Sequence, residues 1–187
     1  MEIISGKYKK SPLKSPNSTK THPMGSREKL ALFNSLLSVL PENSFENLNV
    51  LDAFAGTGAL GLEALSRGAK SVVFVEKSKE ITKTLAENLK NVIKDNNILE
   101  KSTKIIQKDV KNLKKSDFDA DFDLILADPP YDSYSEALIG PLVAFLAPRA
   151  VLALSLPKSA PDPVFDGLTP VSRKNYASAS IIIFQKS

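Results

Sequence analysis

Residues 49–61, Asn-Val-Leu-Asp-Ala-Phe-Ala-Gly-Thr-Gly-Ala-Leu-Gly, decide the fold. The run 49–53 predicts a buried strand, and 58–67 predicts a helix that directly follows it. Between them, residues 56–61 match the pattern G-x-G-x-x-G, and Glu76 lies 20 residues after the first glycine, at the end of the next predicted strand. A strand, a glycine turn, a helix and a distant acid in this order predict an α/β sheet with a nucleotide-type ligand at its first turn.

Two classes of ligand fit this turn. A dinucleotide and S-adenosylmethionine both carry an adenosine, ribose hydroxyls and an anionic group that a helix N-terminus attracts. Asp52, four residues before Gly56, would repel a pyrophosphate but could orient an ammonium or sit near a sulfonium. Asp109 follows another predicted strand and is placed to meet the adenine. These acids favour S-adenosylmethionine over a dinucleotide. The remaining alternative is that the glycine turn serves only tight packing and binds no ligand. The predicted donor-binding residues are Asp52, Phe54, Gly56, Thr57, Gly58, Glu76, Lys77, Asp109 and Val110.

Asp128-Pro129-Pro130-Tyr131 forms a second motif, directly after the apolar run 122–127. Each proline fixes its own φ and lacks an N–H donor, and the residue before each proline is held extended. The carbonyl groups therefore become fixed acceptors, Asp128 adds carboxylate oxygens, and Tyr131 offers a flat face. Acceptors beside a stacking surface suit a planar base with an exocyclic amine. We therefore predict amino-group methylation, with catalytic residues Asp128, Pro129, Pro130 and Tyr131.

The rest of the chain alternates between strand and helix patterns. Further strands are predicted at 71–75, 103–107, 122–127 and 151–156, and helices at 78–94 and near 134–146. Two last strands, near 168–173 and 179–185, are too close together for a helical crossover and predict an antiparallel hairpin. The expected fold is α/β, a Rossmann-like class I methyltransferase domain with a mostly parallel seven-stranded sheet and an antiparallel C-terminal edge.

The excess positive charge of the chain is concentrated near its start. Residues 1–30 hold seven lysines and arginines against two acidic residues, and the formal net charge of the whole chain is +4. Residues 1–25 are expected to form a basic arm or hairpin, followed by a catalytic domain over 26–187. Such an arm indicates a polyanionic partner. The predicted RNA contacts are Lys7, Tyr8, Lys9, Lys10 and Arg27.

Ser26 is expected to be the N-cap of the first helix, and Pro41 is expected to end it. Leu30, Phe33, Leu37 and Leu40 would form its apolar face. These spacings predict an amphipathic helix with one apolar face.

Composition excludes several kinds of site. The 187 residues suffice for one α/β domain and contain no cysteine and one histidine, His22, which is expected to be structural or superficial. Disulfides, thiolate metal sites and cysteine nucleophiles are therefore excluded, and no metal is expected. No run approaches the roughly 18 apolar residues of a membrane helix, and the opening residues lack the long apolar centre of a signal peptide. A cytoplasmic protein without a membrane contact is expected.

Residues 51–69 closely resemble the RsmD family, as do the opening residues 3–9 and the segment Leu32-Phe33-Asn34. Enzymes of this family methylate the N2 amine of one guanine in small-subunit (16S) ribosomal RNA. The resemblance implies S-adenosylmethionine as cofactor and small-subunit ribosomal RNA, or the assembling small ribosomal subunit, as partner.

The chain departs from the family pattern near its first helix. Where the family usually reads Arg-Pro-Thr, this chain has His22-Pro23-Met24, and the usual acid and second arginine fall on Ser26 and Lys29. These positions are expected to contact RNA, so the departures bear on the target base and not on the donor site.

Other functions remain open from the residues alone. The same acceptor motif serves amino-methyltransferases that act on DNA adenine N6 or on protein glutamine. A nicotinamide-dependent oxidoreductase would explain the glycines and Glu76, but it leaves residues 128–131 without a purpose. A non-catalytic RNA-binding scaffold would explain only the basic arm.

Overall fold

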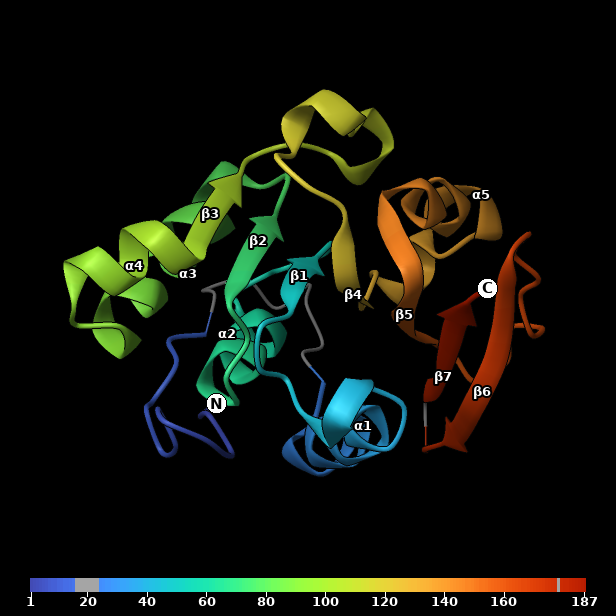
Figure 1. The fold of residues 1–187 in the computed structure, drawn as a ribbon, viewed down its shortest axis with the longest axis horizontal. Coiled ribbons are helices and arrows are strands. Elements are labelled where there is room, and N and C mark those ends of the chain that lie inside the picture. The colour runs from blue at the N-terminus through green and yellow to red at the C-terminus, as the bar shows by residue number, and fades with distance from the viewer. Residues whose placement is uncertain (16–23, 178) are drawn as a thin grey trace.

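A seven-stranded sheet in the order β3-β2-β1-β4-β5-β7-β6 forms the centre of the computed structural model, which describes residues 1–15, 24–177 and 179–187 (Figure 1). Strands β1 to β5 pair in parallel, and β7 runs antiparallel to both β5 and β6. The predicted sheet and its antiparallel C-terminal edge are therefore confirmed. The strands are β1 Asn49–Asp52, β2 Ser71–Val75, β3 Thr103–Ile106, β4 Phe122–Ala127, β5 Leu146–Pro157, β6 Leu168–Asn175 and β7 Ala179–Lys186.

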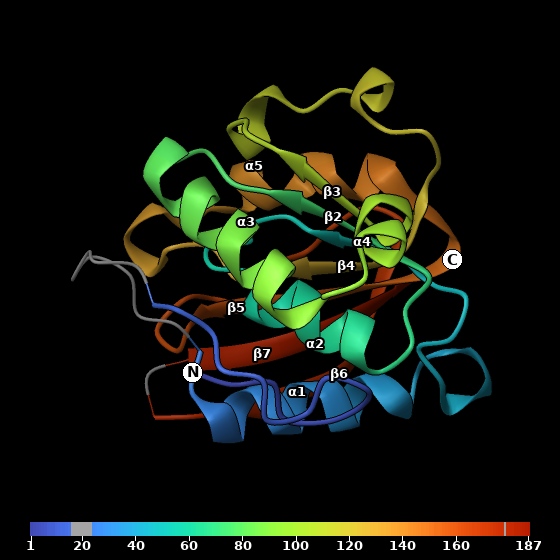
Figure 2. The same cartoon turned by 90° about the vertical axis from the view of Figure 1, so that its left-hand side faces the viewer.

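Helices cover both faces of the sheet (Figures 1 and 2). Helices α1 to α4 pack with one core cluster, and α5 with the 3₁₀ helix that follows it packs with the other. The α-helices are α1 Ser26–Leu37, α2 Ala59–Ser66, α3 Lys79–Val92, α4 Asn96–Ser102 and α5 Glu136–Ile139. Shorter 3₁₀ helices lie at Pro41–Asn43, Val110–Asn112, Lys115–Asp117, Tyr131–Ser133 and Gly140–Phe145.

The buried strands contribute side chains to both core clusters, one on each face of the sheet. Along β4, Leu124 and Leu126 belong to the cluster beneath α1 to α4, whereas Ile125 and Ala127 belong to the cluster beneath α5. Successive side chains of a strand point to opposite faces, so a strand covered on both sides must be apolar at every position. This explains why β4 is apolar throughout its fully buried part, Leu124 to Ala127, whereas the only partly buried Asp123 is polar.

Helix α1 packs through most of its predicted stripe, since Phe33 and Leu40 are buried and Leu37 packs against the core. Its buried apolar residues are Leu32, Phe33 and Leu36, whereas Leu30 is 41% exposed. Lys29 takes the inward position instead, because a buried carboxylate lies there to receive it. The cap also shifts by one residue, since Gly25 is the N-cap and its N–H donates to Glu28 at 3.1 Å.

Three further elements differ from expectation. Helix α4 was not predicted, and the helix expected near 134–146 is only the four-residue α5 followed by a 3₁₀ turn. Pro141 stands where α5 would continue, and a proline inside a helix removes a hydrogen bond and clashes with the preceding turn. Strand β5 begins earlier than predicted, at Leu146.

The start of the chain is a docked hairpin. The Ile3 N–H donates to Ser11 at 3.1 Å, and the Leu13 N–H donates to Met1 at 2.9 Å. Ile3 and Leu13 are buried in the same cluster as α1 to α4. The hairpin therefore shares the core of the sheet, while the part of the predicted arm at 16–23, including His22, lies outside the described residues.

A buried glutamate holds this hairpin. Glu63 on α2 is 0% exposed and accepts hydrogen bonds from the N–H groups of Ile4 at 2.8 Å and Ser5 at 3.0 Å. Arg67 and Lys29 neutralise its charge at 2.9 and 3.5 Å. Loss of one partner from such a buried group typically costs about 3–5 kcal/mol, so the contacts act as a unit.

The Gly6→Ala variant should lose more than about 1 kcal/mol of unfolding free energy. Gly6 has a φ of +83°, and an added Cβ would lie 1.8 Å from the Ser66 carbonyl oxygen. Urea unfolding measures the loss. Gly167→Ala is the matched control, because its φ is +75° with no heavy atom within 4 Å. Equal losses in the two variants would contradict a role for the contact with Ser66.

Candidate active site

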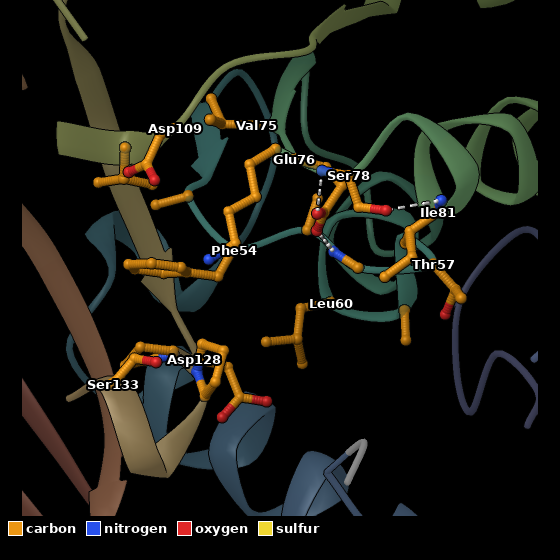
Figure 3. A pocket seen from close by; sticks show the side chains of 18 of the residues that line it. Phe54, Thr57, Leu60, Val75, Glu76, Ser78, Ile81, Asp109, Asp128 and Ser133 are labelled. Atoms are coloured by element: carbon orange, nitrogen blue, oxygen red, sulfur yellow. Dashed lines mark hydrogen bonds between the residues drawn. The ribbon is translucent and has the colours of Figure 1, made fainter. Parts of the chain in front are cut away.

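A cavity of about 1030 Å³ opens at the carboxyl ends of β1, β2 and β4 (Figure 3). It lies at the point where the strand order reverses, because β1 connects to β2 on one side of it and β4 connects to β5 on the other. This is the usual ligand position in open α/β sheets. The structure therefore brings most of the predicted donor and catalytic residues together. Those that line the cavity are Phe54, Gly56, Thr57, Glu76, Lys77, Asp109, Val110, Asp128, Pro129, Pro130 and Tyr131.

Glu76 ties two loops of the cavity together. Its Oε2 accepts from the Gly56 N–H at 3.0 Å, and its Oε1 accepts from the Ser78 N–H at 2.8 Å (Figure 3). A carboxylate oxygen has a second lone pair, so each can still accept a hydrogen bond from a ligand. Glu76 can thus fix the glycine loop and receive ribose hydroxyls at the same time.

The three glycines of the motif have different roles. A Cβ on Gly56 would have no neighbour nearer than 4.0 Å, so its bare backbone faces open space. A Cβ on Gly58 or Gly61 would instead lie 2.5 Å from Leu85 or 2.3 Å from Phe74. Gly56 is therefore the ligand-facing glycine, and the other two let α2 approach its neighbours closely.

Asp52 lies behind the cavity wall and not in its lining. Its Oδ2 accepts from the Gly61 N–H at 2.8 Å, while its buried Oδ1 has no hydrogen-bond partner among the described residues. Burial raises the pKa of Asp52 to about 7, the Gly61 N–H opposes this shift, and the charges of Asp128 and Glu76 add to it. Its predicted contact with the cationic end of a donor remains a prediction.

Phe54 and Asp109 lie on one side of the cavity (Figure 3). Asp109 Oδ1 accepts from the Lys111 N–H at 3.0 Å and begins the 3₁₀ helix that starts with Val110. Asp109 retains acceptor capacity toward the cavity, beside the flat ring of Phe54. The pair can therefore receive a planar heterocycle that bears an amine.

The acceptor motif forms the opposite end of the cavity. Figure 3 shows Asp128 across from Glu76 and Ser78, with Phe54 between them. Burial raises the pKa of Asp128 to about 6, hydrogen bonding from Ser155 opposes this shift, and the charge of Glu28 adds to it. Tyr131 is partly exposed beside Asp128, in keeping with a stacking surface at the cavity mouth.

The predicted RNA contacts are not all beside the cavity. The Lys7 and Tyr8 N–H groups donate to the Ser66 carbonyl and hydroxyl, so residues 7–10 lie at the C-terminal end of α2. The N-terminal end of α2 lines the cavity, and the two ends are roughly 12 Å apart. Arg27 is exposed in the first turn of α1, close in sequence to cavity-lining Lys29.

Tyr8 and Lys29 differ most from the expected RNA-facing positions. The Tyr8 ring packs against the core, with the Lys7 ammonium 5.5 Å from the ring centroid. Lys29 is buried, and its Nζ donates to the Glu2 carbonyl at 2.8 Å. It lines the cavity, yet its charge is already paired with Glu63.

Asn88 connects the hairpin to the glycine loop and was not identified from the sequence. This α3 residue is 0% exposed and donates to the Thr57 carbonyl at 2.9 Å and the Lys14 carbonyl at 3.1 Å. Its Oδ1 accepts from the Lys14 N–H at 2.8 Å. One side chain thus fixes Lys14 relative to the loop that lines the cavity.

Other residues of the site also went unnoticed in the sequence. Met1 and Met24, the only two methionines of the chain, both line the cavity. Ser155 lies beneath the acceptor motif on β5. No local motif marks these residues, because they reach the site through the tertiary fold.

The described residues contain no cluster of three or more acidic, histidine or cysteine side chains suited to a metal. In the same ranges, no helix is long and apolar enough to cross a bilayer.

This sheet and this site define a Rossmann-like methyltransferase. Residues 1–185 match the model of the family described as "Conserved hypothetical protein 95", and the chain belongs to this family, which confirms the resemblance found in the sequence. The "Ribosomal RNA small subunit methyltransferase D" of Haemophilus influenzae is 31% identical over 99% of this chain and 93% of its own length.

Solved structures agree with this assignment. A candidate methylase from Haemophilus influenzae has a TM-score of 0.75 at 26% identity, covering 99% of this chain and 97% of its own. An Escherichia coli protein has a TM-score of 0.80 over 100% of this chain and 98% of its own. Its identity is 23%, so this second likeness concerns the fold alone.

Glu76→Gln should weaken binding of S-adenosylmethionine by about tenfold or more. Glutamine offers one acceptor oxygen where Glu76 uses two, and hydrogen bonds to a charged group are worth about 1.5–3 kcal/mol. Isothermal titration calorimetry measures the dissociation constant. Glu80→Gln, on the exposed first turn of α3, is the control and should bind normally. Equal affinity in both variants would refute the role of Glu76.

Asn88→Ala should reduce the unfolding free energy by about 2–3 kcal/mol, because it leaves buried backbone groups without partners. It should also weaken donor binding, since Thr57 loses its support. Asn91→Ala, on the exposed face of the same helix, should stay within about 0.5 kcal/mol of the parent. Urea unfolding and calorimetry test both effects. A destabilised variant with unchanged donor affinity would contradict the link to the loop.

Proposed function

We propose that this protein transfers a methyl group from S-adenosylmethionine to the exocyclic N2 amine of a guanine in small-subunit (16S) ribosomal RNA. The observation that carries the proposal is that the acceptor motif and the glycine loop share one cavity. The name of the Haemophilus relative supports a ribosomal RNA substrate. The choice of guanine N2 rests on the RsmD resemblance. A cytoplasmic location would follow from such a substrate.

The donor side of the cavity suits S-adenosylmethionine. The bare backbone at Gly56 can approach its carboxylate tail. The free acceptor capacity of Glu76 suits its ribose hydroxyls, and Asp109 beside Phe54 suits its adenine. When bound, S-adenosylmethionine supplies a methyl group made electrophilic by a positively charged sulfur. The buried Asp52 carboxyl close behind the loop favours a cationic ligand over a pyrophosphate.

The acceptor side suits an amine on a planar base. Asp128 and the Pro129 carbonyl would accept its two N–H groups, which makes the nitrogen lone pair available as positive charge develops. Tyr131 would stack on the base, worth roughly 1–3 kcal/mol. A paired base cannot reach this motif, so the target must be unpaired or flipped. The remaining acceleration comes from holding the two reactants in line.

Methyl-labelled S-adenosylmethionine tests the proposal directly. The protein is incubated with small ribosomal subunits, naked small-subunit RNA, duplex DNA and a bulk protein extract, and the labelled product is digested and identified by mass spectrometry. We expect N2-methylguanosine at one position of small-subunit RNA. N6-methyladenine in DNA, methylglutamine, or no transfer to any substrate would overturn the proposal.

Asp128→Asn should reduce kcat by roughly 10²–10³ while donor affinity changes little. Asparagine keeps the shape of the side chain but replaces one acceptor oxygen by a donor. In the parent enzyme, kcat/KM should rise as pH passes upward through about 6, because burial raises the pKa of Asp128 to that value and the carboxylate is the active form. Asp119→Asn, at an exposed position, is the control. A normal kcat in Asp128→Asn would remove Asp128 from the mechanism.

A further inference from the structure

Ser155 is a buried hydroxyl that lies beneath the acceptor motif. It stands on β5, is 3% exposed, and follows Leu154, which pairs with Ala127 on β4. This register places Ser155 beside Asp128, the first residue after β4. A polar side chain at this depth needs hydrogen-bond partners, and the acceptor motif supplies them.

The contacts of Ser155 give a direction to its hydrogen bonds. Its Oγ lies 3.0 Å from the Tyr131 hydroxyl oxygen. The strand register that sets Ser155 beside Asp128 leaves its hydroxyl proton available to that carboxyl, and such a hydrogen bond lowers the pKa of Asp128. Each hydroxyl has a single proton to donate. If Ser155 donates to an ionised Asp128, which has no proton to give, the Tyr131 hydroxyl must donate to Ser155. The only consistent order is Tyr131 to Ser155 to Asp128.

The other groups around Asp128 favour its neutral form. Burial raises its pKa, and Glu28 from α1 adds its charge from the side of the first helix. Asp52, at the end of β1, interacts with Asp128 by the same repulsion. Lys29 lines the cavity but is already paired with Glu63. Of the described groups that shift this carboxyl, Ser155 alone favours the ionised form.

We propose that Ser155 is a positioning residue that joins the Tyr131 hydroxyl and the Asp128 carboxylate in one hydrogen-bonded chain. The chain keeps Asp128 ionised, as an acceptor of amine N–H groups must be, and holds the Tyr131 ring in the orientation that stacks on the base. This inference rests on the proposed function for its purpose, but its central contact can be measured without any substrate.

Carbon-13 NMR of labelled aspartate in the ligand-free protein tests the contact. The Asp128 signal is assigned by its absence from Asp128→Asn, and its titration midpoint is compared among variants. Ser155→Ala should move the midpoint to higher pH by about one unit. Ser155→Thr, which keeps the hydroxyl, should leave it near the parent value. An unchanged midpoint in Ser155→Ala would overturn the proposal.

Ser180→Ala separates this effect from simple loss of a buried serine. Ser180 is equally buried on neighbouring β7, pairs with Leu156, and donates to Asn175 at 2.8 Å, away from the cavity. It should lose stability without moving the Asp128 midpoint. A midpoint that moves as far in Ser180→Ala as in Ser155→Ala would reduce Ser155 to a structural residue and refute the proposal.

Tyr131→Phe tests the other end of the chain, on a partly exposed loop where folding is not at risk. Ser155 keeps its hydrogen bond to Asp128 in this variant, so the Asp128 midpoint should stay near the parent value while kcat falls severalfold.

The pH profile and the double variant test the chain as a whole. The acidic limb of kcat/KM should shift to higher pH only in Ser155→Ala. The double variant should lose less kcat than the product of the single losses, because both break one chain. Independent losses would refute the chain, whereas a parent enzyme that transfers no methyl group refutes the proposed function instead.

Discussion

Carboxylates that accept hydrogen bonds from backbone N–H groups determine the shape of this site. Glu76 binds the amides of Gly56 and Ser78, and Asp52 binds the amide of Gly61. Because these bonds join the loops after β1 and β2 to each other and to α2, the glycine turn is held open before any ligand arrives. A preformed turn of this kind spares the binding step the cost of ordering the loop.

The hairpin at the start of the chain belongs to the same arrangement. Glu63 receives its backbone amides, and Asn88 joins Lys14 to the carbonyl of Thr57. Met1 also lines the cavity, so the hairpin supplies part of the wall as well as support. Its lysines at 7–10 project at the far end of α2, where a long polyanion could contact them and the cavity together.

Local patterns predicted the parts of the structure that depend on local chemistry. Strands 71–75 and 122–127 were predicted to the residue, because cover on both faces makes most of their residues apolar. The exposure of Leu30 and the burial of Lys29 in α1 were not predicted, because burial of Lys29 depends on Glu63, which is 34 residues away. Ser155 and Asn88 could not be found either, since a lone serine in a strand or asparagine in a helix acquires its role only from distant neighbours.

The position of β7 has a consequence for synthesis on the ribosome. β7 is made after every other strand, yet it lies between β5 and β6 and supplies the hydrogen bonds that attach β6 to the sheet. Until it leaves the exit tunnel, β5 has an open edge and β6 has no partner. A nascent chain released before Ala179 would therefore expose one open edge, on β5, and one unpaired strand, β6. Prematurely terminated products of this kind are prone to aggregation and are ready targets for proteases.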